Sequence, residues 1–101
     1  MTEFRNRVLN TVRQIPSGQA VSYKKVAELS GSPRAYRAVG NIMRKNNDSK
    51  IPCHRVIRSD KTPGGYSLGG TREKELRLTR ENARLDSGEK IKYTIERNLR
   101  G

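Results

Sequence analysis

The sequence predicts one small α+β domain, mainly helical and winged-helix-like, with a helix-turn-helix and a small β element. Apolar residues recur at helical spacing near the N-terminus and again before residue 45. Two of the expected helices are separated by a short turn that contains glycine, which is typical of a helix-turn-helix. Val56-Ile57 is a strand-forming pair after a proline-containing turn. We therefore assign residues 1–101 to a single domain, because 101 residues are too few for two.

The chain opens with the pattern of an amphipathic helix over residues 3–15. Thr2 is expected to be its N-cap, and Pro16-Ser17-Gly18 is expected to end it. After this turn, Ala20-Val21 predicts a brief extended segment. The residues that recur at helical spacing are Phe4, Val8, Thr11, Val12 and Ile15.

Two further helices are expected from Tyr23 to Leu29 and from about Pro33 to Lys45. Ser22 is expected to cap the first of them, and Ser30-Gly31 to terminate it. Ser32 is expected to cap the second, with Pro33 at the first helical position, where a missing N–H costs nothing.

The helix expected from Pro33 to Lys45 has an apolar face and a basic stripe roughly opposite, at about 100° per residue. It contains no acidic residue, and Gly40 in its middle would permit close backbone approach. Such a helix is typical of one that lies in a DNA groove, although an ordinary surface helix can also be basic. The apolar face comprises Ala35, Ala38, Val39, Ile42 and Met43, and the stripe comprises Arg34, Arg37, Asn41 and Arg44.

The C-terminal half is expected to contain one more helix, from Thr71 to Arg84, with Leu76, Leu78 and Ala83 facing inward. Loops of polar and turn residues precede it, at 46–50 and 58–65. Residues 89–97 alternate weakly at Ile91, Tyr93 and Ile95, which indicates an edge strand or an extended tail over 86–101.

Near the middle of the chain, the only cysteine and the only histidine are adjacent, as Cys53 and His54. A lone cysteine is more often a small buried apolar residue, but a thiolate is also the best nucleophile among common side chains. A neighbouring imidazole can take its proton. Because Pro52 favours extended geometry before it and a strand is expected after it, we place the pair on a turn that presents the thiol to a pocket.

The composition favours a nucleic-acid partner. Lys and Arg total 22 against 10 Asp and Glu, which gives a net charge of +12. A small, strongly basic domain indicates DNA or RNA before an anionic membrane, although a solvated basic surface is the alternative. One cysteine cannot form an internal disulfide, which is consistent with a cytoplasmic protein, and one cysteine with one histidine is too few for zinc. No apolar run approaches a transmembrane span and no leader opens the chain.

Several motifs between Phe4 and Glu81 resemble, in order, those of the O6-alkylguanine-DNA alkyltransferases, a family of direct-reversal DNA repair proteins. Pro-Cys-His-Arg-Val at 52–56 resembles the reactive motif of that family. The other matching segments are Ser22-Tyr23, Arg37-Ala38-Val39-Gly40, Asn46 at the hinge, Tyr66-Ser67 in the guanine pocket, and Lys74 with Glu81 in the last helix.

The resemblance implies a one-time transfer of an alkyl group from O6 of guanine to Cys53. A relay of His54, a water and Glu81 would activate the thiol, and the Tyr23 hydroxyl would stabilise charge on the departing guanine. Asn46 completes this catalytic set. The Ser67 N–H would assist Tyr23, and no cofactor is implied. The expected substrate pocket comprises Val56, whose carbonyl would accept from the guanine amine, with Tyr66, Ser67 and Lys74.

The implied partner is double-stranded DNA that contains O6-alkylguanine, bound by a monomer. The helix-turn-helix would enter the minor groove, the lesion would be flipped out, and Arg37 would fill the vacated space. Arg34, Asn41, Arg44 and Tyr36 are the other expected DNA contacts.

The chain also departs from the family pattern. We expect the N-terminal domain that many members carry to be absent. The loop before Pro52 is one residue shorter and has no proline, and Leu68 is an insertion. Two other classes stay open. One is the non-enzymatic alkyltransferase-like proteins, which flag lesions and typically carry tryptophan in place of the cysteine. The other is a dimeric helix-turn-helix regulator, which gives no reason for Cys53-His54.

Overall fold

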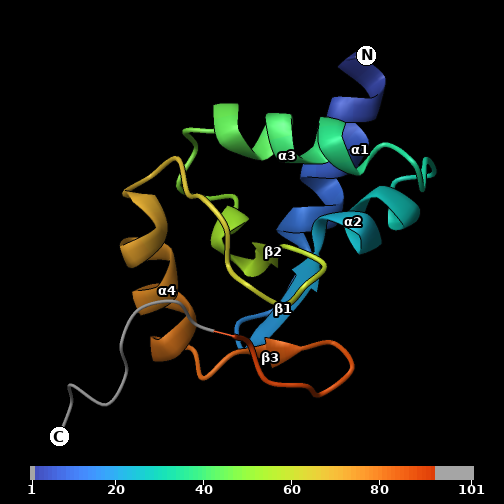
Figure 1. Cartoon of the computed structure of the whole chain (residues 1–101). Helices are drawn as coiled ribbons and strands as arrows, with labels where there is room; N and C mark the ends of the chain where they lie inside the picture. The colour runs from blue at the N-terminus through green and yellow to red at the C-terminus, as the bar shows by residue number, and fades with distance from the viewer. Residues whose placement is uncertain (1, 93–101) are drawn as a thin grey trace, which may run out of the picture.

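Helices dominate the computed structural model of the chain, which describes residues 2–92 (Figure 1). The predicted class, α+β and mainly helical with a helix-turn-helix and a small β element, is confirmed. In chain order the elements are α1 (Thr2–Arg13), β1 (Gln19–Ser22), α2 (Tyr23–Leu29), α3 (Tyr36–Lys45), the 3-10 turn η1 (Cys53–Arg55), β2 (Val56–Ile57), α4 (Gly70–Arg80) and β3 (Arg84–Leu85). None of the helices described has the length and apolar character needed to cross a bilayer.

The helix-turn-helix is formed by α2 and α3. As predicted, Ser22 caps α2, because its hydroxyl accepts the backbone N–H of Lys25 at 3.0 Å. Gly31 follows the helix with a φ of +91°, a conformation that favours glycine. The expected start of α3 is wrong: the helix begins at Tyr36, after a turn in which Ala35 N–H donates to Ser32 O at 2.9 Å. Ser32 therefore belongs to the connection, since its own N–H donates to the Ala27 carbonyl.

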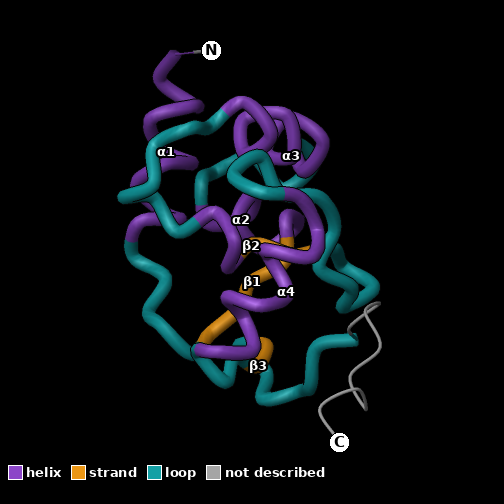
Figure 2. Tube along the Cα trace, turned by 90° about the vertical axis from the view of Figure 1, so that its left-hand side faces the viewer, coloured by secondary structure: helices purple, strands orange, loops and turns teal. Residues whose placement is uncertain are grey.

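The three strands form a parallel sheet in the order β2-β1-β3. The sheet lies between α1, α2 and α3 on one side and α4 on the other (Figures 1 and 2). Successive side chains of a strand point to opposite faces, so β1 and β2 each supply both cores. Val21 and Val56, which are paired in the register, join the core beneath α1, α2 and α3. Ala20 and Ile57 join a smaller core with Leu78 of α4.

The last helix differs from its prediction in length and in its buried face. It ends at Arg80 because Asn82 takes a φ of +54° and Ala83 N–H returns to the Leu78 carbonyl at 3.0 Å. Its inward face holds Lys74, Glu75 and Leu78, whereas Leu76, expected inward, is 39% exposed. Gly69 rather than Thr71 precedes the helix as its N-cap residue.

The structure also places Thr2 and the segment that follows α4. Thr2 is the first residue of α1 rather than its cap. Residues 84–85 form β3, which the sequence did not predict, and residues 89–92 are irregular, although Ile91 is buried against β1 and α4. Tyr93 and Ile95 lie outside the described residues.

Candidate active site and nucleic-acid interface

Cys53 is the first residue of the 3-10 turn that leads directly into β2, as the sequence predicted. Cys53 is 3% exposed, and its backbone N–H donates to the Ile51 carbonyl at 2.7 Å. The Asn46 amide donates to Sγ of Cys53 at 3.5 Å. The surroundings of Cys53 therefore place a polar N–H group against the sulfur of the candidate nucleophile.

Asn46 lies at the end of α3 and joins three parts of the site. Its side chain closes the following loop, because Nδ2 donates to Asp48 O and Oδ1 accepts from Asp48 N, both at 3.2 Å. Its carbonyl accepts the Ser67 hydroxyl at 2.6 Å. One buried residue thus connects α3, Cys53 and the loop that holds Ser67.

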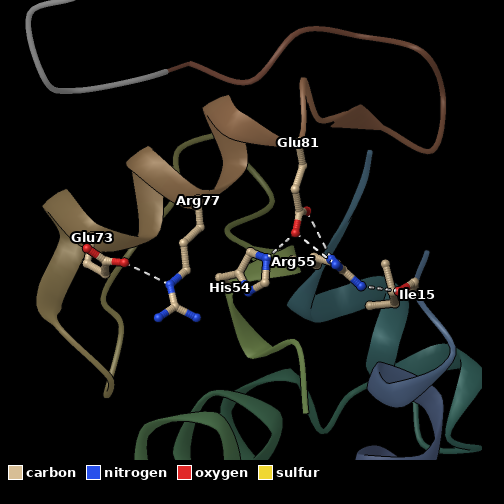
Figure 3. Close-up of polar contacts among 6 residues, drawn as sticks. All are labelled: Ile15, His54, Arg55, Glu73, Arg77 and Glu81. Atoms are coloured by element: carbon tan, nitrogen blue, oxygen red, sulfur yellow. Dashed lines mark hydrogen bonds and ion pairs between the residues drawn. The ribbon is translucent and has the colours of Figure 1, made fainter. Parts of the chain in front are cut away.

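His54, Arg55 and Glu81 form one charged cluster between η1 and the end of α4 (Figure 3). The Glu81 carboxylate lies 2.8 Å from His54 Nε2 and accepts two bonds from Arg55, at 3.0 and 2.8 Å. Arg55 also donates to the Ile15 carbonyl at 2.8 Å. A carboxylate can only accept, so Nε2 carries the hydrogen and the other ring nitrogen, Nδ1, is free to act as a base.

The pKa values of this cluster keep it in the state that a base requires. Burial is the largest influence on the pKa of His54 and lowers it. The charges of Arg55 and Arg77 act in the same direction, and together they exceed the raising effect of the Glu81 carboxylate, so the imidazole stays neutral at neutral pH. Burial favours protonation of Glu81, but the bonds from Arg55 and His54 outweigh it and lower its pKa. The cluster therefore combines a neutral imidazole with an ionised carboxylate.

A cavity of about 380 Å³ opens in front of Cys53. Its size falls in the range of small-ligand sites. It is lined by Tyr23, Gly40, Met43, Arg44, Cys53, Arg58, Gly65, Tyr66 and Ser67. Of the expected pocket residues, Tyr66 and Ser67 lie in the wall, and Val56 lies in the core with no part in the lining.

Lys74 lies behind the cavity wall rather than in it. It is 1% exposed, its ammonium donates to the Gly65 carbonyl at 3.1 Å, and it lies 5.6 Å from the centre of the Tyr23 ring. Burial lowers its pKa to about 8. Lys74 thus supports two residues of the wall, Gly65 and Tyr23.

A second hollow of about 420 Å³ continues from the first along α3. The two share Tyr23, Gly40, Arg44 and Arg58 in their linings. The rest of the lining of the second hollow is formed by Tyr36, Arg37, Asn41 and Ser59. Arg34 lies apart, in the turn before α3, next to a different shallow hollow. The exposed basic face of the helix-turn-helix is therefore continuous with the cavity of Cys53.

Sequence reasoning missed four contributors to this site. In the sequence Arg55 stands out only as part of a motif, although a carboxylate as little exposed as that of Glu81, at 16%, needs a cation. Met43 was assigned to the core, and it also lines the cavity. Arg58 and Gly65 were assigned to a loop, and no local signal in the sequence distinguishes them.

Most of the chain matches a known protein family. Residues 3–83 match the family described as 6-O-methylguanine DNA methyltransferase, DNA binding domain. A methylated-DNA--protein-cysteine methyltransferase of Rattus norvegicus is 48% identical over 80 residues, which are 77% of this chain and 38% of that protein. The protein of the same name from Methanothermobacter thermautotrophicus is 44% identical over 84% of this chain and 47% of its own. The chain thus spans less than half the length of these curated relatives.

Solved structures of similar fold include DNA complexes. Mycobacterium tuberculosis OGT in complex with DNA has a TM-score of 0.75 and 37% identity, over 82% of this chain and 52% of that chain. S. pombe Atl1 in complex with damaged DNA containing O6-carboxymethylguanine has a TM-score of 0.72 and 31% identity, over 80% of this chain and 77% of that one.

Proposed function

This chain belongs to the O6-alkylguanine-DNA alkyltransferase family, and on that premise we propose that it repairs alkylated guanine in DNA by a single transfer of the alkyl group to Cys53. The observation that carries this proposal is the position of Cys53 in the wall of a cavity that is continuous with an exposed basic helix. A nucleophile with a base on the neighbouring residue, beside a surface for DNA, suits a reaction on a base of that DNA.

The proposed step is a displacement at the alkyl carbon. The Cys53 thiol loses its proton to Nδ1 of His54 through a water, while Glu81 holds the imidazole. The sulfur attacks the carbon in line with its bond to O6, that bond breaks, and its electron pair stays on the guanine. The Tyr23 hydroxyl and the Ser67 N–H stabilise the resulting charge. The product thioether is stable, so each molecule acts once and needs no cofactor.

DNA is bound by the helix-turn-helix, with the lesion flipped into the cavity. The hollow along α3 would receive the strand, and Arg37 would fill the space that the base leaves. Tyr36, Asn41 and Arg44 line the same hollow and would contact the backbone, and Arg34 would do so from the preceding turn. Contacts of this kind make binding independent of sequence and sensitive to salt.

The remaining pocket residues would hold the guanine. Tyr66 is fixed beside the site, because its ring centre lies 6.3 Å from that of His54 and the Arg77 guanidinium lies 5.4 Å above it. The carbonyls of Cys53 and Val56 would accept from the guanine amine. Lys74 would hold the wall through Gly65.

One observation favours a second function, recognition of the lesion without transfer. The match to Atl1 covers most of both chains, whereas the match to the OGT covers about half of that chain. Retention of a cysteine in the cavity argues for transfer, because the lesion-flagging class typically has tryptophan at that position.

Intact-protein mass spectrometry with a duplex that contains O6-methylguanine tests the proposal. A gain of one methylene in the wild type, and none in Cys53→Ser, is the expected result. Tight binding without a change of mass in the wild type would favour the recognition function instead. We further propose that the protein acts as a monomer in the cytoplasm, which size-exclusion chromatography with light scattering and cell fractionation would test.

A further inference from the structure

Three charged residues follow one face of α4 and its C-terminal end, because Glu73, Arg77 and Glu81 are spaced four residues apart (Figure 3). Glu81 meets His54 Nε2 at 2.8 Å, and the proposed transfer uses that contact. Glu73 and Arg77 have no part in the transfer as described so far, although they lie on the same face.

Arg77 connects α4 to the wall of the reactive cavity through an aromatic ring. Its guanidinium lies 5.4 Å from the centre of the Tyr66 ring, and Tyr66 lines the cavity. The same ring meets His54 edge to face, with the ring centres 6.3 Å apart and the planes at 75°. The Tyr66 ring therefore has Arg77 and His54 as neighbours.

Glu73 holds Arg77 in this position, and the start of α4 holds Glu73. Nε of Arg77 donates to the Glu73 carboxylate at 2.8 Å. The stem of Glu73 packs on Gly69, where φ is +136° and an added Cβ would be 2.8 Å from Cβ of Glu73. The next residue, Gly70, donates its N–H to the Tyr66 carbonyl at 2.9 Å. One short segment thus fixes both the backbone of Tyr66 and the cation beside its ring.

The imidazole of His54 needs more than its contact with Glu81 to act as a base. A single hydrogen bond fixes the position of Nε2, but the ring plane, and with it the direction of Nδ1, can still turn about that bond. A base must be directed at the proton that it removes. The edge-to-face contact with Tyr66 supplies the second constraint on the ring.

We propose that Arg77, held by Glu73, is a positioning residue for the transfer: it keeps the Tyr66 ring against His54 and thereby sets the direction of Nδ1. This inference rests on the proposed function, in which His54 takes the proton of Cys53. Arg77 acts from behind the wall, since it is not among the residues that line the cavity in the described part of the chain.

Nuclear magnetic resonance of the free protein tests the contact without any reaction. His54 is the only histidine, so its ring signals are unambiguous, and the ring current of Tyr66 shifts them. In Arg77→Met, we expect the His54 ring protons to move toward their shifts in Tyr66→Leu. Arg72→Gln removes the same charge from an exposed position of α4 and should leave them in place. Unchanged shifts in Arg77→Met would overturn the inference.

Single-turnover transfer from a duplex with O6-methylguanine, at saturating protein, tests the consequence. The rate of Arg77→Met should fall roughly three- to tenfold, the scale of one edge-to-face ring contact, and Arg77→Lys should keep part of it. Because Arg77 acts through Tyr66, the double variant with Tyr66→Leu should be no slower than Tyr66→Leu alone. Additive losses, together with weaker binding of undamaged DNA, would instead assign Arg77 to a phosphate contact.

The pH dependence separates position from charge. The titratable and charged groups that face His54 from α4, η1 and the following loop are Glu81, Arg77, Cys53, Arg55 and Tyr66. Residues 19–22 of β1, which also packs against η1, contain none. Burial lowers the pKa of His54 most, and the charges of Arg55 and Arg77 add to this. Arg77→Met should therefore move the acid limb of the rate profile to higher pH.

Above that limb, the deficit of Arg77→Met should persist, because the imidazole is neutral in both proteins and only its direction differs. A deficit that disappeared at alkaline pH would be explained by charge alone and would overturn the inference. Failure of the wild type to transfer methyl would refute the proposed function, and the ring-proton shifts of His54 would still decide whether Arg77 positions the imidazole.

Discussion

Replacing Glu81 by glutamine is expected to destabilise the domain by about 3 kcal/mol at neutral pH, which is the low end of the cost of breaking a buried ion pair. The carboxylate accepts two bonds from Arg55, and the two side chains are 17% and 16% exposed. It also lies 2.8 Å from His54 Nε2. Glutamine keeps the shape but leaves Arg55 without its counter-ion. For a domain of this size, the loss corresponds to a decrease in Tm of roughly 12–24 °C.

Urea unfolding followed by far-UV circular dichroism measures this difference, and α4 supplies a matched control. Glu73→Gln breaks an i,i+4 pair with Arg77 that has the same 2.8 Å distance but is 31% and 37% exposed. An exposed pair of this kind contributes less than about 1 kcal/mol. If Glu81→Gln lost no more stability than Glu73→Gln, the claim that burial makes the Glu81 cluster strong would be refuted.

The deficit of Glu81→Gln should also depend on pH. The pKa of Glu81 is lowered in the folded protein, because the bonds from Arg55 and His54 exceed the effect of burial. A carboxyl with a lowered pKa contributes stability that is complete above its ordinary value of 4.5 and is lost as the pH falls through the folded value. The wild type and the variant should therefore converge in stability in acid, and a constant difference down to the acid limit would contradict the assignment.

Three further predictions concern the helix, the base and the groove. Gly40→Ala should stabilise α3 by up to about 1 kcal/mol in urea unfolding, since no atom outside its own turn of helix lies within 4 Å of the added Cβ. The same variant should bind DNA more weakly in a fluorescence anisotropy titration, because that Cβ enters both hollows. The pKa of His54 is lowered by burial, so wild-type stability should begin to fall as the pH drops below 6.5, and His54→Gln should lack this component; an identical pH profile in both proteins would refute it. Arg37→Ala should weaken binding to a lesion duplex and reduce the slope of log affinity against log salt by about one, and an unchanged slope would remove Arg37 from the interface.

Features that depend on neighbours in the chain were predictable from the sequence. The Ser22 cap, the turn at Ser30-Gly31 and the helix Tyr23–Leu29 follow from hydrogen bonds between residues three or four apart, and all were confirmed. The same is true of Cys53 on a turn that enters a strand, because Pro52 and Val56-Ile57 act locally. The roles of the catalytic residues came from the resemblance and stay predictions.

The sequence predicted the wrong buried residues in α4, where contacts with distant parts of the chain decide which side chains face inward. The sequence predicts Leu76 inside and Lys74 at the surface of a pocket, but Lys74 and Glu75 are buried beside the expected Leu78, and Leu76 is exposed. Burial of Lys74 is tolerated because its ammonium meets the Gly65 carbonyl and the Tyr23 ring, two groups from other parts of the chain. Hydrophobicity along one helix holds no information about such partners.

By itself, then, the sequence determined the helix-turn-helix, the basic face of its second helix and the turn with Cys53 and His54 that leads into a strand. The tertiary structure alone decided that the strands are parallel, that Arg55 binds the Glu81 carboxylate, and that Arg58 reaches the cavity of Cys53. The physical reason is distance along the chain. Glu81 lies 26 residues from Arg55, and the loop of Arg58 is held by Glu89, 28 residues beyond Lys61, so these contacts exist only once the sheet has brought the segments together.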